Sequence, residues 1–119
     1  MKTKCIMAEP ISLDEIQLTE PIYFDDMVKG VVDIKKEIVA LHAEMHSDLE
    51  QLLLDNGSNQ KDLFGFNIYF DDGELEVDSN INPPRNAELG FPRAGRLVTE
   101  PNTVAKIESI VFRMVLKDE

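Results

Sequence analysis

The chain has 119 residues, 43% of them hydrophobic, which fits one globular domain with a single core. Its formal net charge of −11 disfavours direct binding to nucleic acid or anionic lipid, because phosphate groups attract clustered lysine and arginine. The one cysteine, Cys5, excludes an intramolecular disulfide, and no apolar run is long enough for a membrane span or a signal peptide. We therefore expect a soluble, cytoplasmic protein that forms one domain over residues 1–119.

The N-terminal part predicts a strand, a helix and a pair of strands. Residues 4–8 form the first strand, and Ser12 followed by Glu15 is the capping-box pattern that opens a helix. Residues 31–34 and 38–41 are rich in β-branched side chains and are separated by three charged residues, which predicts a hairpin. Both faces of these segments are apolar, so we expect central strands.

The middle of the chain predicts a second helix and a second hairpin. Ser47 and Glu50 repeat the capping-box spacing, and Gly57 marks the end of the helix that they open. Residues 65–70 alternate between apolar and polar side chains, and residues 74–82 alternate again after an Asp-Asp-Gly turn. These two strands should pair and present one polar face.

The C-terminal part predicts a long loop and a last helix. Residues 83–101 hold four of the six prolines, and Pro101 suits the first position of a helix whose apolar stripe runs from Val104 to Val115. The order strand, helix, strand, strand, helix, strand, strand, helix contains no regular βαβ repeat. We therefore predict an α+β fold, with a mainly antiparallel sheet of about five strands and helices packed on one face.

Two histidines are candidates for chemistry. His42 and His46 are four residues apart, but no further His or Cys accompanies them, so we predict no metal site and no cofactor. His46 is either a hydrogen-bonded group at a helix entrance or a catalytic acid or base. In the catalytic alternative, Asp78 or Asn82 and an arginine of the long loop converge on His46.

Three asparagines stand on the predicted polar strand face, although asparagine is a poor strand former. Asn67, Asn80 and Asn82 either fix nearby loop backbone through their side chains or recognise a polar ligand. We regard all three as candidates for binding a ligand or a partner.

Three of the four arginines lie in the long loop, at Arg85, Arg93 and Arg96. A guanidinium group binds carboxylate or phosphate through two parallel hydrogen bonds, so these residues are candidates for an anion site. They could equally pair with the protein's own carboxylates or with those of a second copy.

Several short segments together resemble a small uncharacterised prokaryotic family, a domain of unknown function, over residues 10–116. The segments are EMHSDLE at 44–50, LFGFNIY at 63–69 and DSNIN at 78–82. His46 and the asparagines Asn67 and Asn82 match the family pattern, whereas His42 does not. The pattern continues Ile-Asn-x-Arg-Pro where this chain has Ile-Asn-Pro-Pro-Arg, so no role is carried over to the loop arginines. The resemblance implies a shared fold and a candidate surface, and no activity.

The leading hypothesis from the sequence is a non-catalytic protein-binding or assembly domain, whose acidic surface and arginine loop contact a partner protein or another copy of the chain. A basic partner would suit the net charge of −11. The alternative is a small hydrolase or nuclease that uses His46 with carboxylates and a loop arginine.

Overall fold

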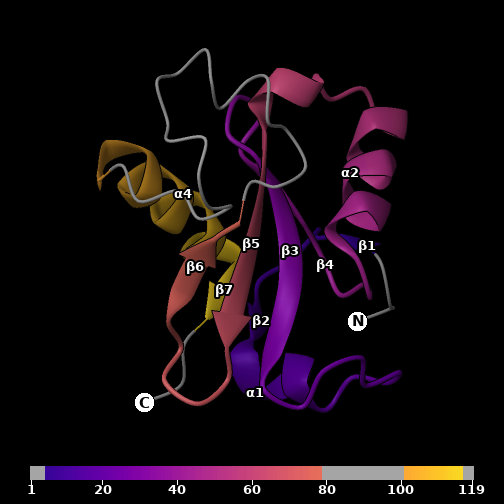
Figure 1. The fold of residues 1–119 in the computed structure, drawn as a ribbon, viewed down its shortest axis with the longest axis vertical. Helices are drawn as coiled ribbons and strands as arrows, with labels where there is room; N and C mark the ends of the chain where they lie inside the picture. The colour runs from indigo at the N-terminus through magenta and orange to yellow at the C-terminus, as the bar shows by residue number, and fades with distance from the viewer. Residues whose placement is uncertain (1–4, 79–100, 117–119) are drawn as a thin grey trace.

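A five-stranded antiparallel sheet forms the centre of the computed structural model, which describes residues 5–78 and 101–116 (Figure 1). The strands lie in the order β1-β4-β3-β5-β6. Their bounds are Cys5–Ile6 for β1, Met27–Asp33 for β3, Ile38–Leu41 for β4, Leu63–Tyr69 for β5 and Leu75–Val77 for β6. The predicted α+β fold with an antiparallel sheet of about five strands is confirmed.

Alternate residues of the central strands supply two separate apolar clusters, one on each face of the sheet. Val32 of β3 and Phe64 of β5 belong to the larger cluster, which includes buried residues of α1 (Leu13–Gln17) and α4 (Pro101–Met114). Val31 and Leu63, one residue earlier on each strand, belong to the smaller cluster beneath α2 (His46–Asp55). Each fully buried side chain of this kind contributes about 1.5–3 kcal/mol to folding.

The helices therefore lie on opposite faces of the sheet, and the prediction that they pack on one face is wrong. Figure 1 shows α2 and α4 on either side of the central strands β3 and β5. The physical reason is the composition of β3 and β5, which are apolar in both directions and need cover on both faces.

The first helix is capped as predicted, because the N–H of Glu15 donates to Ser12 Oγ at 3.2 Å. The structure adds a small parallel sheet that the sequence did not reveal, formed by β2 (Ile11–Ser12) and β7 (Val115–Leu116). Strands of two residues have no detectable periodicity, so pattern analysis assigned Val115 to the last helix.

The predicted capping box at Ser47 is wrong. The N-cap of α2 is Met45, which is extended (φ −130°, ψ 143°) and makes no side-chain cap hydrogen bond. A helix that begins at His46 buries Leu49 and Leu53 against the sheet, and it brings the His46 side chain to β5. The end of α2 is as predicted, with Gly57 in the left-handed region at φ +96°.

The turn between β3 and β4 is held by the buried carboxylate of Asp33. Asp33 Oδ1 accepts hydrogen bonds from the backbone N–H groups of Lys35 and Lys36, both at 2.9 Å. Asp33 Oδ2 accepts a hydrogen bond from the Ser58 hydroxyl at 2.7 Å, which ties the turn to the segment after α2. The Asp33 carboxylate thus accepts the hydrogen bonds of backbone N–H groups that have no strand partner in the turn.

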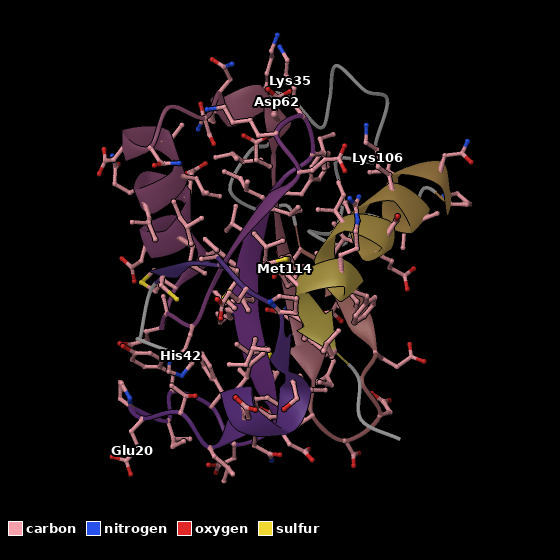
Figure 2. The ribbon with its side chains drawn as sticks, turned by 180° about the vertical axis from the view of Figure 1, so that it is seen from behind. Glu20, Lys35, His42, Asp62, Lys106 and Met114 are labelled. Carbon is pink, nitrogen blue, oxygen red and sulfur yellow. The ribbon has the colours of Figure 1, made fainter. Side chains whose placement is uncertain are left out.

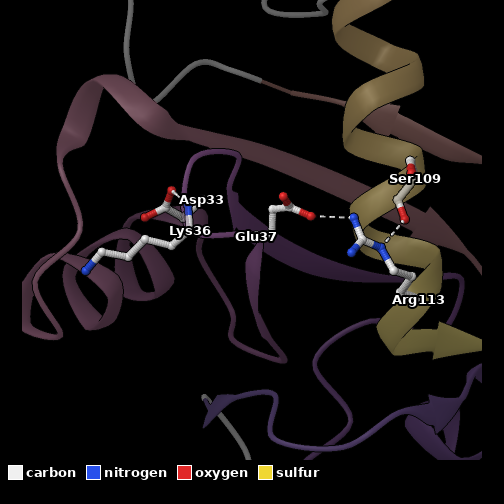
Figure 3. Close-up of polar contacts among 5 residues, drawn as sticks. All are labelled: Asp33, Lys36, Glu37, Ser109 and Arg113. Carbon is white, nitrogen blue, oxygen red and sulfur yellow. Dashed lines mark hydrogen bonds and ion pairs between the residues drawn. The ribbon is translucent and has the colours of Figure 1, made fainter.

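The last helix is joined to the same turn by an ion pair (Figure 3). Arg113 of α4 donates to Glu37 Oε1 at 2.6 Å and to the carbonyl oxygen of Ser109 at 3.1 Å. The pair is exposed to solvent, so it orients α4 more than it stabilises the fold.

Four strands have bounds that differ from those expected, and the first of them, β1, covers only Cys5–Ile6 where residues 4–8 were predicted. β3 begins at Met27, four residues before the predicted segment, and β5 begins at Leu63, directly after the short 3-10 helix η1 (Gln60–Asp62). β6 spans Leu75–Val77, whereas the predicted strand ran to residue 82, and residues 79–82 lie outside the described part. None of the helices in the described ranges is long and apolar enough to cross a membrane.

Candidate functional site

Polar side chains interrupt the otherwise apolar sheet face beside the first turn of α2. Lys29 of β3, Asn67 of β5 and Glu76 of β6 are direct neighbours across the three strands. They point to the α2 side because they alternate with residues of the larger apolar cluster. We use the term polar face for the set formed by Lys29, His46, Asn67, Tyr69, Glu76 and Asp78.

Asn67 is the most deeply buried member of the polar face, with 2% of its surface exposed. Its Nδ2 donates to Glu76 Oε1 at 3.1 Å, and the Tyr69 hydroxyl donates to the same oxygen at 3.3 Å. Among the described residues, no partner lies in good hydrogen-bond geometry to the buried Asn67 Oδ1, although the Asn67 side chain is close enough to the His46 ring to raise its pKa. Because an unsatisfied buried acceptor costs about 1–3 kcal/mol, stability alone does not account for an asparagine here.

His46 is the first residue of α2 and reaches the backbone of β5. Its Nε2 lies 2.9 Å from the carbonyl oxygen of Phe66, and since a carbonyl only accepts, Nε2 carries the proton. In the neutral ring Nδ1 is therefore the acceptor. The ring lies on Gly65, where an added Cβ would come within 3.2 and 3.3 Å of two ring carbons and would collide with the carbonyl oxygen of Asp78.

The surroundings of His46 favour its neutral form. Burial lowers the pKa of His46 below 6.5, and the positive charge of Lys29 acts in the same direction. The hydrogen bond to the Phe66 carbonyl opposes this shift, as do the negative charge of Asp78 and the side chain of Asn67. The net effect is a lowered pKa, so the ring is neutral near pH 7 and has an acceptor nitrogen.

Asp78 extends the pairing of β6 with β5. Its N–H donates to the Gly65 carbonyl at 2.8 Å, and only 4% of the residue is exposed. Two residues after Glu76, its side chain takes the same side of the sheet, close enough for its charge to act on His46. The fold thus adds Asn67 to His46 and Asp78, two residues that the catalytic alternative already placed together.

Residues 5–114 match the model of the family described as Protein of unknown function (DUF5674). The chain belongs to this family. The resemblance to an uncharacterised family is therefore confirmed, and the matched range includes every residue of the polar face. No curated protein and no solved structure matches the chain.

Several candidate residues of this member of the DUF5674 family fall outside the described part of the chain. They are Asn80, Asn82, Arg85, Arg93 and Arg96. Conversely, sequence reasoning missed Lys29, because the predicted strand began at residue 31. The alternation of Lys29 with its apolar neighbours was the signal that could have placed it on the polar face.

His42 does not belong to the polar face. It follows β4 in the left-handed region at φ +72°, and its ring packs against Tyr23 with 5.2 Å between the ring centroids. Burial lowers the pKa of His42, whereas hydrogen bonds with the backbone of Thr19 and Pro21 raise it. The two histidines therefore have separate surroundings. Within residues 5–78 and 101–116, no group of three or more His, Cys, Asp or Glu side chains is placed to hold a metal ion.

Proposed function

We propose that the chain is a cytoplasmic, non-catalytic binding domain whose contact site is the polar face, and that it recognises a polar segment of a partner protein. The observation that carries this proposal is the buried Asn67 Oδ1, for which residues 5–78 and 101–116 offer no hydrogen-bond partner of good geometry. A polar group that costs stability is retained where it serves another purpose, and the partly exposed side chains around it are the groups that a partner can contact, namely Lys29, His46, Tyr69 and Glu76.

The chemistry of the polar face suggests which groups the partner presents. With His46 neutral, the face has acceptors at Asn67 Oδ1, at His46 Nδ1 and on the carboxylate of Glu76. Lys29 is its one cationic member. Acceptors thus outnumber donors, which favours a partner segment that offers N–H groups from its backbone or from Asn, Gln, Lys or Arg side chains.

The replacement of Asn67 by leucine tests this proposal without knowledge of the partner. Leucine has a similar size, suits a strand and removes the unsatisfied acceptor, so we expect Asn67→Leu to change the free energy of unfolding by less than about 1 kcal/mol or to increase it. Ser58→Ala is the matched control, because it removes the buried hydrogen bond to Asp33 and should destabilise the fold by about 1 kcal/mol.

The second half of the test is binding. We expect short asparagine- and arginine-containing peptides to shift the NMR signals of the Asn67 side-chain amide and of the His46 ring in the wild type. In the Asn67→Leu variant, the same peptides should leave the backbone signals around position 67 unchanged. A loss of more than about 2 kcal/mol of stability in Asn67→Leu would mean that the residue serves the fold. The binding proposal would then fail.

A second candidate function is acid–base catalysis, as in a small hydrolase. It is favoured by the geometry of His46, whose Nε2–H is fixed by the Phe66 carbonyl and whose Nδ1 is free of its proton near pH 7. In such a reaction Nδ1 takes a proton from an attacking water, and the nearby negative charge of Asp78 stabilises the imidazolium.

The test of this second function is hydrolysis of activated esters and phosphodiesters by the wild type and by His46→Gln. Glutamine preserves an N–H donor for the Phe66 carbonyl but cannot take up a proton near neutral pH. Loss of activity in His46→Gln, with a wild-type rate that rises as the imidazole deprotonates, supports catalysis. An inactive wild type, or an equally active variant, rules it out for these substrates.

A further inference from the structure

One end of the molecule carries exposed acidic side chains along two segments, and Lys29 Nζ reaches this end, 5.2 Å from the centre of the Phe24 ring. This end is formed by residues 13–26 and 70–74, which contain no Lys, Arg or His. The two segments are joined by a hydrogen bond from the Phe70 N–H to the Asp26 carbonyl, at 2.9 Å. Figure 1 shows α1 and the turn between β5 and β6 at this same end. Its exposed carboxylates are those of Asp14, Glu15, Glu20, Asp25, Asp26, Asp71, Asp72 and Glu74. We refer to this surface as the acidic end.

Exposed apolar side chains stand among these carboxylates. Leu18 is 79% exposed and Ile22 is 49% exposed. A third exposed apolar residue, Leu116, pairs with Ser12 directly before α1. In the described ranges only four large apolar side chains are exposed, so most of them gather near one end. Water-exposed apolar side chains within a charged rim are typical of an interaction surface.

The segment that presents Leu18 and Ile22 is held in place from inside the molecule. The Thr19 hydroxyl donates to the Glu15 carbonyl at 2.7 Å, and the buried His42 ring lies close enough to the backbone of Thr19 and Pro21 for them to raise its pKa. Figure 2 shows His42 and Glu20 at the same end of the molecule. The exposed side chains therefore project from an anchored segment, and a partner would lose less conformational entropy on binding it.

The charge of the acidic end decides what can cover it. Nucleic acid and anionic lipid are repelled, and a second copy docked symmetrically through the same end would bring its own eight carboxylates against these eight. The occupant must supply both positive charge and apolar side chains. We propose that the acidic end docks a basic, amphipathic segment of a partner protein, with lysines or arginines over the carboxylates and apolar side chains on Leu18 and Ile22.

The acidic end borders the polar face, since Lys29 Nζ lies over the Phe24 ring, but the two proposals are tested by different substitutions and can fail separately. The probe is a synthetic helical peptide with lysines on one face and leucines on the other, added to the full chain. Binding is measured by calorimetry and by backbone NMR shifts. We expect the shifts at residues 13–26 and 70–74, and we expect affinity to fall as salt is raised, because salt screens exposed charges.

Two pairs of substitutions separate a specific surface from general acidity. Leu18→Ser with Ile22→Ser should weaken binding about tenfold or more through lost apolar contact, and Asp25→Asn with Asp26→Asn should weaken it and reduce its salt dependence. The matched control is Asp48→Asn with Asp55→Asn, because these carboxylates are exposed on α2, away from the acidic end. The control should bind like the wild type.

Three results would overturn the proposal. The first is equal weakening by the α2 control, which would show that only net charge matters. The second is equal binding of a scrambled peptide that has the same composition but no apolar face. The third is concentration-dependent self-association that Leu18→Ser with Ile22→Ser abolishes, which would mean that a second copy covers this end.

Discussion

Gly65 is the position where a single methyl group should disturb the polar face most directly. A Cβ at Gly65 would collide with the carbonyl oxygen of Asp78 and press on the His46 ring at 3.2 and 3.3 Å. The carbonyl belongs to the backbone of the strand partner and cannot rotate away, so β6 or the ring must move. Overpacking of this kind costs about 1–3 kcal/mol, and a weakened hydrogen bond from His46 to Phe66 adds about 1 kcal/mol. We therefore expect Gly65→Ala to lower the free energy of unfolding by about 2–4 kcal/mol.

Urea denaturation of the wild type and the variant measures this loss, and an NMR titration of the His46 ring follows the site itself. We expect the pKa of His46 to move toward 6.5 in Gly65→Ala, because a displaced ring is less buried. Gly57→Ala is the control. Because Gly57 has a φ of +96°, alanine at this position should lower the free energy of unfolding by roughly 1–2 kcal/mol, while the His46 titration should not change. A loss below about 0.5 kcal/mol in Gly65→Ala, with an unchanged titration, would refute the packing of His46 on Gly65.

Three further predictions concern the fold and its response to pH. Asp33→Ala should lower the free energy of unfolding in urea by about 2–4 kcal/mol, because it leaves buried donors without their acceptor. A loss as small as that of Ser58→Ala would contradict this. Arg113→Ala should cost less than about 1 kcal/mol and only at low salt, because its pair with Glu37 is exposed; a larger, salt-independent cost would show that the pair is structural. The pKa of His46 is lowered in the folded state, so the unfolded chain takes up the proton first and stability should fall as the pH drops below 6.5. His46→Gln should make this dependence less steep in denaturation curves recorded across that range, with the part due to the lowered pKa of His42 remaining, and an equally steep curve would assign the effect to other groups.

The candidate site was only partly visible in the sequence. His46 stood out as an unexplained histidine at a helix entrance, and the alternation of β5 put Asn67 on a polar strand face. Nothing in the local pattern linked these residues to each other or to Lys29, because their proximity depends on β3, β5 and β6 being adjacent. The unsatisfied oxygen of Asn67 is also a property of packing, which no pattern of residue types can show.

Local chemistry by itself determined the elements whose signals lie within a few residues. The Ser12 cap, the hairpin of β3 and β4, the stop at Gly57 and the start of α4 at Pro101 all follow from side chains near the positions concerned. The antiparallel class of the sheet followed from the order of these elements.

Tertiary structure alone decided which face each helix covers and where α2 begins. Both choices depend on contacts between distant segments: β3 and β5 are apolar on both faces, and His46 bonds to a carbonyl twenty residues away. The parallel pairing of β2 with β7 likewise joins the two ends of the described chain. The periodicity of a segment tells which of its residues are buried, but not which partner buries them, because that choice is made by the packing of the whole domain.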